Sequence, residues 1–163
     1  MSPLSSYLSA AKQSFSRYPL IVSGERSWCA DFLSANQAEL EAFNGLYIGS
    51  ECPLSNYTCL PAAQVKSRLG IEYPLVIWDG FSGISPDGLG AISGTIKGGG
   101  LLILLLPSLD TLANTPDPDY LRICAHPDEL ANVGTFFLQR LVKHCHSESC
   151  LLLQQGKTPA NNF

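Results

Sequence analysis

The stretch Leu89–Asp110, LGAISGTIKGGGLLILLLPSLD, places six consecutive aliphatic residues directly after three consecutive glycines. The six, Leu101–Leu106, show no alternation of polar and apolar side chains, which predicts a strand buried on both faces. They fall far short of the about 20 residues that cross a bilayer. Such a strand belongs at the centre of a sheet, and Gly98–Gly100 predict a tight turn into it from a preceding helix.

The preceding helix is predicted to begin at Pro86. Ser85 is placed to cap it, proline favours its first position, and Asp87 complements the positive end of its dipole. The residues expected on one side of the helix are Leu89, Ile92, Ser93 and Ile96. The small residues expected to let a neighbour pack closely are Gly88, Gly90, Ala91 and Gly94.

The rest of the chain alternates between apolar runs and helical patterns. Strands are expected at residues 18–23, 45–49, 73–79 and 149–156. Helices are expected at residues 2–17, with Ser2 as N-cap, and at residues 27–43, 62–70 and 133–145. Residues 50–61 are interpreted as a loop, and residues 108–130 as a surface excursion with one short helix. The inward residues of the last helix are expected to be Phe136, Phe137, Leu141 and Val142.

This alternation predicts an α/β domain of three layers, with a mainly parallel sheet of four to five strands and helices on both faces. We expect a flavodoxin-like or Rossmann-like order in which the first, third and fourth of the predicted strands are central. A length of 163 residues with 45% hydrophobic content suits one core, so residues 1–156 are expected to form a single domain. The polar residues 157–163 are expected to be a tail or the start of a linker.

Candidate site residues follow the predicted strands. Ligands of open α/β sheets bind outside the carboxyl ends of the strands, where this chain has the segments SGERSW, DGFSG and PSLD. The candidates for a shared crevice are Glu25, Arg26, Asp79, Ser82 and Asp110. Ser-Gly and Asp-Gly pairs also form ordinary turns, so turn formation without catalysis is the competing interpretation.

Several classes of site lack their motif in this sequence. Without G-x-x-x-x-G-K-[ST] there is no P-loop, and without G-x-S-x-G there is no nucleophile elbow. SGERSW replaces the glycine-rich loop of Rossmann-like methyltransferases, which remain the enzyme-class alternative. His126, His144 and His146 lie outside the crevice segments. KHCHSESC has no matching second cysteine pair, so the six cysteines are expected to be free thiols and no metal site is predicted.

The composition and charge of the chain limit the kinds of partner that it is expected to bind. The chain has 10 Lys and Arg against 14 Asp and Glu, a formal charge of −4, and its basic residues are scattered. Nucleic-acid binding normally needs a basic stripe, so any RNA contact is expected to be minor. No basic and apolar signal-peptide pattern opens the sequence. A soluble, cytoplasmic protein without membrane contact is the expectation.

Three separated segments occur in an order typical of one family: LIVSGERSW, LGIEYPLVIWDGFSGISPDGLGAISGTIKGGGLLILLLP and PDPDYLRI. The chain resembles the N-terminal domain of the bacterial tRNA(Met) cytidine acetyltransferases, which form N4-acetylcytidine at the wobble position of elongator methionine tRNA. The resemblance extends from Arg17 to Leu153 and is strongest from Leu69 to Pro107. The positions that match the family's pattern are Ser23, Gly24, Glu25, Trp28, Asp79, Gly83, Asp87, Gly94 and Gly99.

The resemblance implies a role within a larger enzyme. In that family the domain precedes a helicase-like ATPase module, an acetyltransferase module that binds acetyl-CoA, and a tRNA-contacting tail. The sequence contains neither a phosphate loop nor an acetyl-CoA loop, so the resemblance transfers no catalytic residue and no cofactor to it. Acetyl-CoA, ATP and Mg would belong to the parent enzyme.

The resemblance therefore implies an accessory domain that docks on the other modules, with contact to tRNA(Met) secondary. The candidate crevice or docking residues are Ser23, Gly24, Glu25, Arg26, Trp28, Asp79, Gly83 and Asp87. The fold-defining glycines are Gly94, Gly98, Gly99 and Gly100. A free-standing module that binds a small ligand or nucleotide is the alternative.

Overall fold

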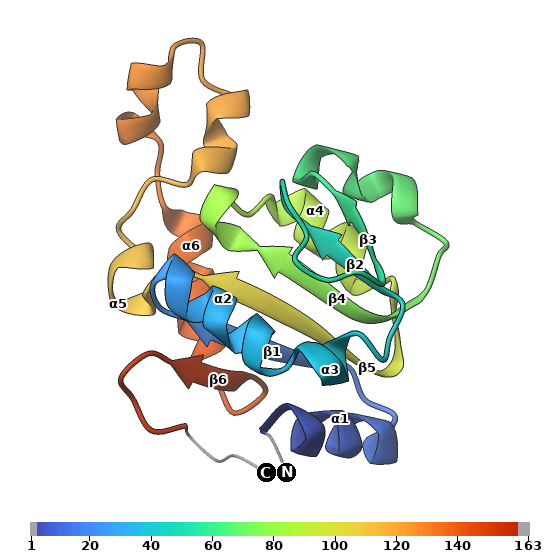
Figure 1. The fold of residues 1–163 in the computed structure, drawn as a ribbon. Coiled ribbons are helices and arrows are strands. Elements are labelled where there is room, and N and C mark those ends of the chain that lie inside the picture. The colour runs from blue at the N-terminus through green and yellow to red at the C-terminus, as the bar shows by residue number, and fades with distance from the viewer. Residues whose placement is uncertain (1–2, 160–163) are drawn as a thin grey trace.

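The computed structural model describes residues 3–159, which contain one six-stranded sheet with every pair of neighbouring strands parallel (Figure 1). The strands are β1 (Tyr18–Ser23), β2 (Gly45–Ile48), β3 (Tyr57–Leu60), β4 (Tyr73–Asp79), β5 (Ile96–Leu106) and β6 (Leu151–Gln154). The three-layer α/β prediction is confirmed, with six strands in place of four to five. The order β3-β2-β4-β5-β1-β6 differs from the Rossmann order 3-2-1-4-5-6 and the flavodoxin order 2-1-3-4-5, although β1, β4 and β5 are interior strands as expected.

The aliphatic run forms the centre of the sheet, as predicted. β5 lies between β4 and β1, and its side chains alternate between two separate cores. The residues Leu102, Leu104 and Leu106 belong to one core, and Leu101, Ile103 and Leu105 to the other. Because both faces are buried, no polar side chain is needed in this run.

Helices cover both faces of the sheet. One face carries α1 (Pro3–Ser14), α2 (Arg26–Ala35) and α3 (Gln37–Leu40). The other carries the 3₁₀ helix η1 (Ala62–Arg68) and the helices α4 (Pro86–Ser93), α5 (Leu109–Leu112) and α6 (Phe136–Cys145). The hydroxyl of Ser85 caps α4 by accepting a hydrogen bond from the Gly88 N–H at 3.2 Å, as predicted. The predicted cap Ser2 lies outside the described residues.

The predicted glycine joint is wrong. α4 ends at Ser93, and the turn into β5 is made by Gly94 and Thr95, whose N–H and hydroxyl both donate to the Ile92 carbonyl. Ile96 is consequently in the strand, not on the face of α4. Of the predicted small positions, Gly88 packs closely against Trp78, whereas Gly90 faces open space.

Gly98–Gly100 instead form a bulge inside β5. Tyr73 of β4 pairs with Ile96 of β5, and the next pair is Leu75 with Leu101. The chain therefore advances two residues on β4 but five residues on β5 between these pairs. Gly99 has a φ of +81°, donates to the Ser16 carbonyl and lies against the backbone of α1. The glycines therefore admit α1 and the chain that follows it to the edge of β5.

Three local predictions need correction. The segment 50–61 contains β3, a short edge strand that pairs with β2. The helix expected at 27–43 is divided at Asn36, whose side-chain amide donates to the Phe32 carbonyl at 2.8 Å and competes with the helical pattern. Phe136 is 76% exposed, because Leu138 and Cys145 occupy the buried side of α6.

The excursion after α5 projects from the body of the domain (Figure 1). We call residues 116–134 the arm. It contains two 3₁₀ helices, η3 (Pro118–Arg122) and η4 (Pro127–Asn132), which contact each other. The three prolines of the excursion, Pro116, Pro118 and Pro127, favour such short turns over a longer helix.

Candidate functional site

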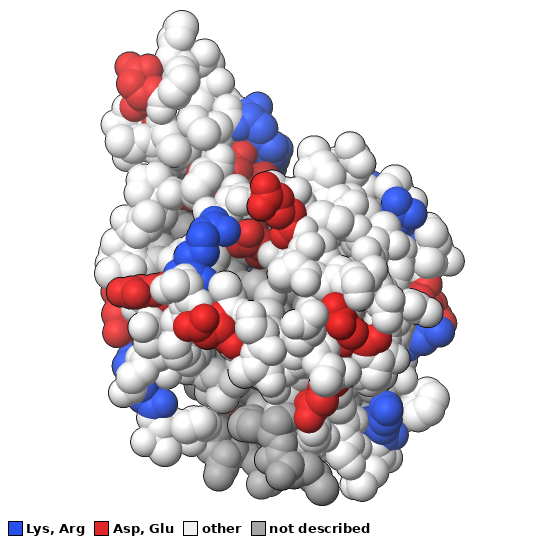
Figure 2. All heavy atoms as spheres, in the orientation of Figure 1, with Lys and Arg blue, Asp and Glu red and all other residues white. Residues whose placement is uncertain are grey.

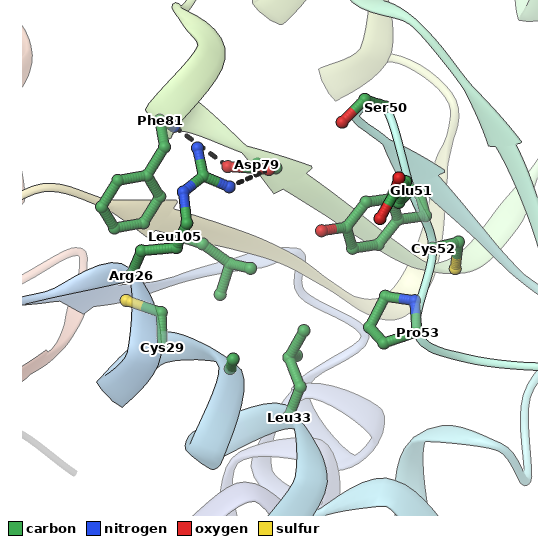
Figure 3. Close-up of a pocket in the computed structure, with 12 residues that line it drawn as sticks. Arg26, Cys29, Leu33, Ser50, Glu51, Cys52, Pro53, Asp79, Phe81 and Leu105 are labelled. Atoms are coloured by element: carbon green, nitrogen blue, oxygen red, sulfur yellow. Dashed lines mark hydrogen bonds and ion pairs between the residues drawn. The ribbon is translucent and has the colours of Figure 1, made fainter.

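A cavity of about 320 Å³ lies at the carboxyl ends of β2, β4 and β5, between α2 and the loop that follows β2 (Figure 3). This is the position at which open α/β sheets bind ligands. Its lining residues are Arg26, Cys29, Ala30, Leu33, Tyr47, Ser50, Glu51, Cys52, Pro53, Asp79, Phe81 and Leu105. Two of the sequence candidates, Arg26 and Asp79, are among them.

Arg26 and Asp79 form an ion pair inside this cavity. Arg26 is the first residue of α2, and its Nη1 lies 3.0 Å from the Oδ2 of Asp79 at the end of β4. The second oxygen, Oδ1, accepts the Phe81 N–H at 3.0 Å, which caps the 3₁₀ turn η2 (Gly80–Ser82). The guanidinium also lies over the Phe81 ring, 4.6 Å from its centroid. Both oxygens of the buried carboxylate are therefore engaged (Figure 3).

Besides the ion pair, the cavity contains the ionisable side chains of Cys29 and Tyr47, which are in their neutral forms. Burial, followed by the nearby charge of Asp79, raises the pKa of the Cys29 thiol from 9.0 to about 11. The same two causes, burial first, raise the pKa of the Tyr47 hydroxyl. The Cys29 thiol donates to the Val22 carbonyl at 3.5 Å. Near neutral pH these groups are a thiol and a phenol, not a thiolate and a phenolate.

Cys29 is expected to resist alkylation in the folded protein. The rise in its pKa lowers the thiolate fraction about a hundredfold at neutral pH, and only 1% of the residue is exposed. Mass spectrometry after iodoacetamide treatment should find the exposed Cys59 modified at least about a hundred times faster than Cys29. In denaturant the two rates should converge. Equal rates in the folded protein would show that Cys29 is accessible and activated.

A second hollow of about 330 Å³ contains the candidates Ser23, Gly24 and Glu25 at the end of β1 and Asp110 after β5. Its lining residues are Ser23, Gly24, Glu25, Ser108, Asp110, Gln154, Gln155 and Lys157. Their groups are used structurally. The Ser23 hydroxyl donates to the Pro107 carbonyl and accepts the Leu109 N–H, both at 3.0 Å. The Glu25 N–H donates to the Gln155 side chain at 2.8 Å, and Lys157 pairs with Asp110 at 3.1 Å. The single crevice expected from the sequence is thus two separate hollows.

The remaining candidates lie outside both hollows. Trp28 packs against Gly24, where a Cβ would lie 2.9 Å from its ring. Gly83 has a φ of +108°, and a Cβ there would lie 2.5 Å from the Asp119 nitrogen, so it allows the base of the arm to approach. Asp87 pairs loosely with Lys66 at 3.8 Å in solvent. Ser82 ends η2 without lining the cavity.

Sequence reasoning missed several residues that make the cavity. Cys29 and Phe81 line the cavity because α2 and η2 turn these two residues toward it. A rule based on strand ends does not say which side of a neighbouring helix faces the cavity.

Asp117, which lies outside this cavity, was also missed: it is 2% exposed and accepts the N–H groups of Ile84 and Asp119 at 3.2 and 2.9 Å. Burial raises the pKa of its carboxyl group. Its signal was present in the segment PDPDYLRI, where an Asp precedes Pro at the start of a turn.

Residues 3–159 show neither a cluster of metal-ligating side chains nor a helix that could span a membrane. Within residues 3–159, His, Cys, Asp and Glu side chains do not gather in groups of three or more that would hold a metal ion. In KHCHSESC, Cys145 and Cys150 are buried whereas His144 and His146 are exposed. Across the same residues, none of the helices combines the length and the apolar character that crossing a bilayer requires. On the face seen in Figure 2, acidic and basic side chains are interspersed.

Comparison with known proteins identifies the family. The family model described as "tRNA(Met) cytidine acetyltransferase TmcA, N-terminal" matches residues 1–155. A tRNA(Met) cytidine acetyltransferase TmcA of Nitrosococcus halophilus is 36% identical over 153 residues, which are 93% of this chain and 20% of the relative. One of Pectobacterium atrosepticum is 31% identical over 139 residues, 85% of this chain and 19% of the relative.

A third relative matches a shorter part of the chain. A TmcA of Haloferax volcanii is 38% identical over 79 residues, 48% of this chain and 10% of that relative. The chain spans about a fifth of the length of the curated relatives that it matches over most of its own length. The chain belongs to the family of N-terminal domains of tRNA(Met) cytidine acetyltransferase TmcA.

Proposed function

We propose that this chain is an accessory domain of a tRNA(Met) cytidine acetyltransferase, without catalytic activity of its own, which docks on the ATPase and acetyltransferase modules of the enzyme. The observation that carries the proposal is that two reactive groups of the main cavity, the Asp79 carboxylate and the Cys29 thiol, are respectively engaged and protonated. The Asp79 carboxylate is held by Arg26 and the Phe81 N–H, and the pKa of Cys29 is about 11. An engaged carboxylate and a protonated thiol are poor bases and nucleophiles.

The cofactors and the substrate of the reaction then belong mainly to the rest of the enzyme. The relatives are about five times as long as the segment that this chain matches, which leaves room for the other modules. On this proposal acetyl-CoA, ATP and Mg²⁺ bind there, and tRNA(Met) contacts this domain only secondarily. The cytoplasmic location and the domain boundary at residue 156 stay predictions.

The arm supports docking. Leu121 and Ile123 are 46% and 61% exposed on it, although large aliphatic side chains gain about 2 kcal/mol from burial. The base of the arm is fixed, because Asp117 binds the backbone of Ile84 and Asp119. A projecting segment with a fixed base and two exposed aliphatic side chains suits insertion into a groove of another folded module. We propose that the occupant of this surface is the remainder of the same enzyme.

A chimaeric enzyme tests the proposal. Residues 1–155 of this chain would replace the matching segment of the full-length Nitrosococcus halophilus relative, and N4-acetylcytidine formation on tRNA(Met) would be measured. The double variant L121S/I123S should lower the rate at least about tenfold, because apolar contacts at interface centres each contribute over 1 kcal/mol. The matched control is L69S/I71S, which changes exposed residues before β4 and should stay within about twofold. Equal rates for both variants would refute docking through the arm.

The second candidate function is binding of a small ligand or nucleotide. It is favoured by one observation, the place of the 320 Å³ cavity at the carboxyl ends of the strands. Native mass spectrometry of the isolated chain would then show a co-purified molecule, and Asp79→Ala would release it. The accessory-domain proposal expects the mass of the bare chain.

A further inference from the structure

A groove of about 900 Å³ runs along the exposed side of α6, away from the main cavity. Its lining residues are Pro86, Phe136, Phe137, Arg140, Leu141, Lys143, His144 and Ser147, and we call it the α6 groove. The opposite side of α6 buries Leu138 and Cys145 in the core. The helix is therefore fixed to the sheet and presents the groove to solvent.

The α6 groove is locally basic in an acidic chain. The whole chain has a formal charge of −4, yet residues 130–147 contain no Asp or Glu and include Arg140 and Lys143. Among residues 3–159 the ion pairs involve Arg26, Lys66, Arg122 and Lys157, so neither cation of α6 is neutralised by an acidic partner. Two unpaired cations on one helix face attract an anionic partner.

An exposed aromatic ring lies in line with these cations. Phe136, Arg140 and His144 are spaced by four residues and share one stripe of α6, with successive members about 6 Å apart along the axis. The Phe136 residue is 76% exposed, while its ring packs on one side against Gly134, where a Cβ would lie 2.9 Å away. A cation pair beside an open aromatic ring is the combination that holds nucleic-acid strands, by phosphate neutralisation and base stacking.

We propose that the α6 groove is an RNA contact surface, in which Arg140 and Lys143 neutralise phosphates and Phe136 stacks on an unpaired base. The inference deepens the proposed function, on which the identification of the RNA as tRNA(Met) rests. An acidic protein surface would use the cations but would leave the exposed ring without a role. This contact would be local, in agreement with the absence of a basic stripe from the sequence.

Nuclear magnetic resonance titration of the 163-residue chain tests the inference. The probes are a tRNA(Met) transcript and a 12-nucleotide uridine oligomer, each at 50 and 200 mM salt. Saturable shifts are expected for the amides of residues 134–147. R140A/K143A should weaken binding at least about tenfold and lower the salt slope by about 1.4 to 1.8, since each phosphate contact contributes about 0.7 to 0.9. F136A should weaken binding about 5- to 100-fold with the slope unchanged.

The matched control is K66A/K97A, which removes two exposed lysines from elsewhere and should weaken binding less than about threefold. No saturable shift, shifts outside α6, or equal binding of polyglutamate with no effect of F136A would overturn the inference. The chimaera result does not enter this test. If the titration shows no RNA binding while L121S/I123S still lowers the rate of the chimaera, only the RNA contact is refuted. If RNA binds while L121S/I123S has no effect on that rate, only docking through the arm is refuted.

Discussion

Replacing Trp78 by alanine is expected to lower the free energy of unfolding by about 3 to 5 kcal/mol. Trp78 lies on β4 with 0% exposure, and its indole N–H donates to the Gly83 carbonyl at 3.2 Å. Its ring also reaches α4, where a Cβ on Gly88 would lie 2.8 Å from it. Alanine would leave a cavity between the sheet and α4 and would deprive a buried carbonyl of its donor.

Urea denaturation followed by far-ultraviolet circular dichroism measures this loss. The control is Trp28→Ala, which removes the other tryptophan from the half-buried outer part of α2. Its cost should be under about 2 kcal/mol, because less apolar surface is lost from the core. A cost below about 1 kcal/mol for Trp78→Ala would contradict the central packing role assigned to this residue.

The second large effect is expected at the glycine bulge. A Cβ at Gly100 would lie 2.5 Å from the Pro74 carbonyl oxygen and 3.0 Å from the Lys97 carbonyl oxygen. Both are backbone atoms, so the clash moves the strands themselves. Gly100→Ala should therefore cost at least about 2 kcal/mol.

Gly90→Ala is the matched control for this substitution. Gly90 lies inside α4, and a Cβ there would meet nothing within 4 Å. Alanine is a better helix former than glycine, so this variant should gain about 0.5 to 1 kcal/mol. Thermal melting compares the two directly. If Gly100→Ala left the midpoint unchanged or raised it, as Gly90→Ala should, the bulge would not be tightly packed.

The architecture could be predicted because the strands carry an unambiguous signal. A run such as Leu101–Leu106 has no polar position, so it suits only the interior of a parallel sheet. The cap at Ser85 could also be predicted, because the serine, proline and aspartate each favour a helix start. The glycine bulge could not be predicted, because Gly98–Gly100 suit a helix end and a strand bulge equally. The choice depends on the approach of α1, which is a tertiary contact.

The candidate site was predicted in part for the same reason. The strand-end rule brought Arg26 and Asp79 together, 53 residues apart in sequence. The rule could not separate Asp110 and Ser23 from them, because that separation depends on the strand order. β5 lies between β1 and β4, and the addition of β6 beside β1 creates the second hollow. The surface excursion was predicted, but the two 3₁₀ helices of the arm were not, since its turns are fixed by Asp117 binding a distant loop.

We propose that the domain acts by docking and not by chemistry in its cavity. The most direct test is the rate of N4-acetylcytidine formation by the chimaeric enzyme carrying R26Q/D79N, which keeps the shape of the cavity and removes both charges. Arg26 is 60% exposed in its side chain, so the pair contributes little to stability and the variant should fold. If the domain docks, the rate stays within about threefold of the unmodified chimaera. A loss of a hundredfold or more with unchanged melting would contradict the claim and make the cavity an active site.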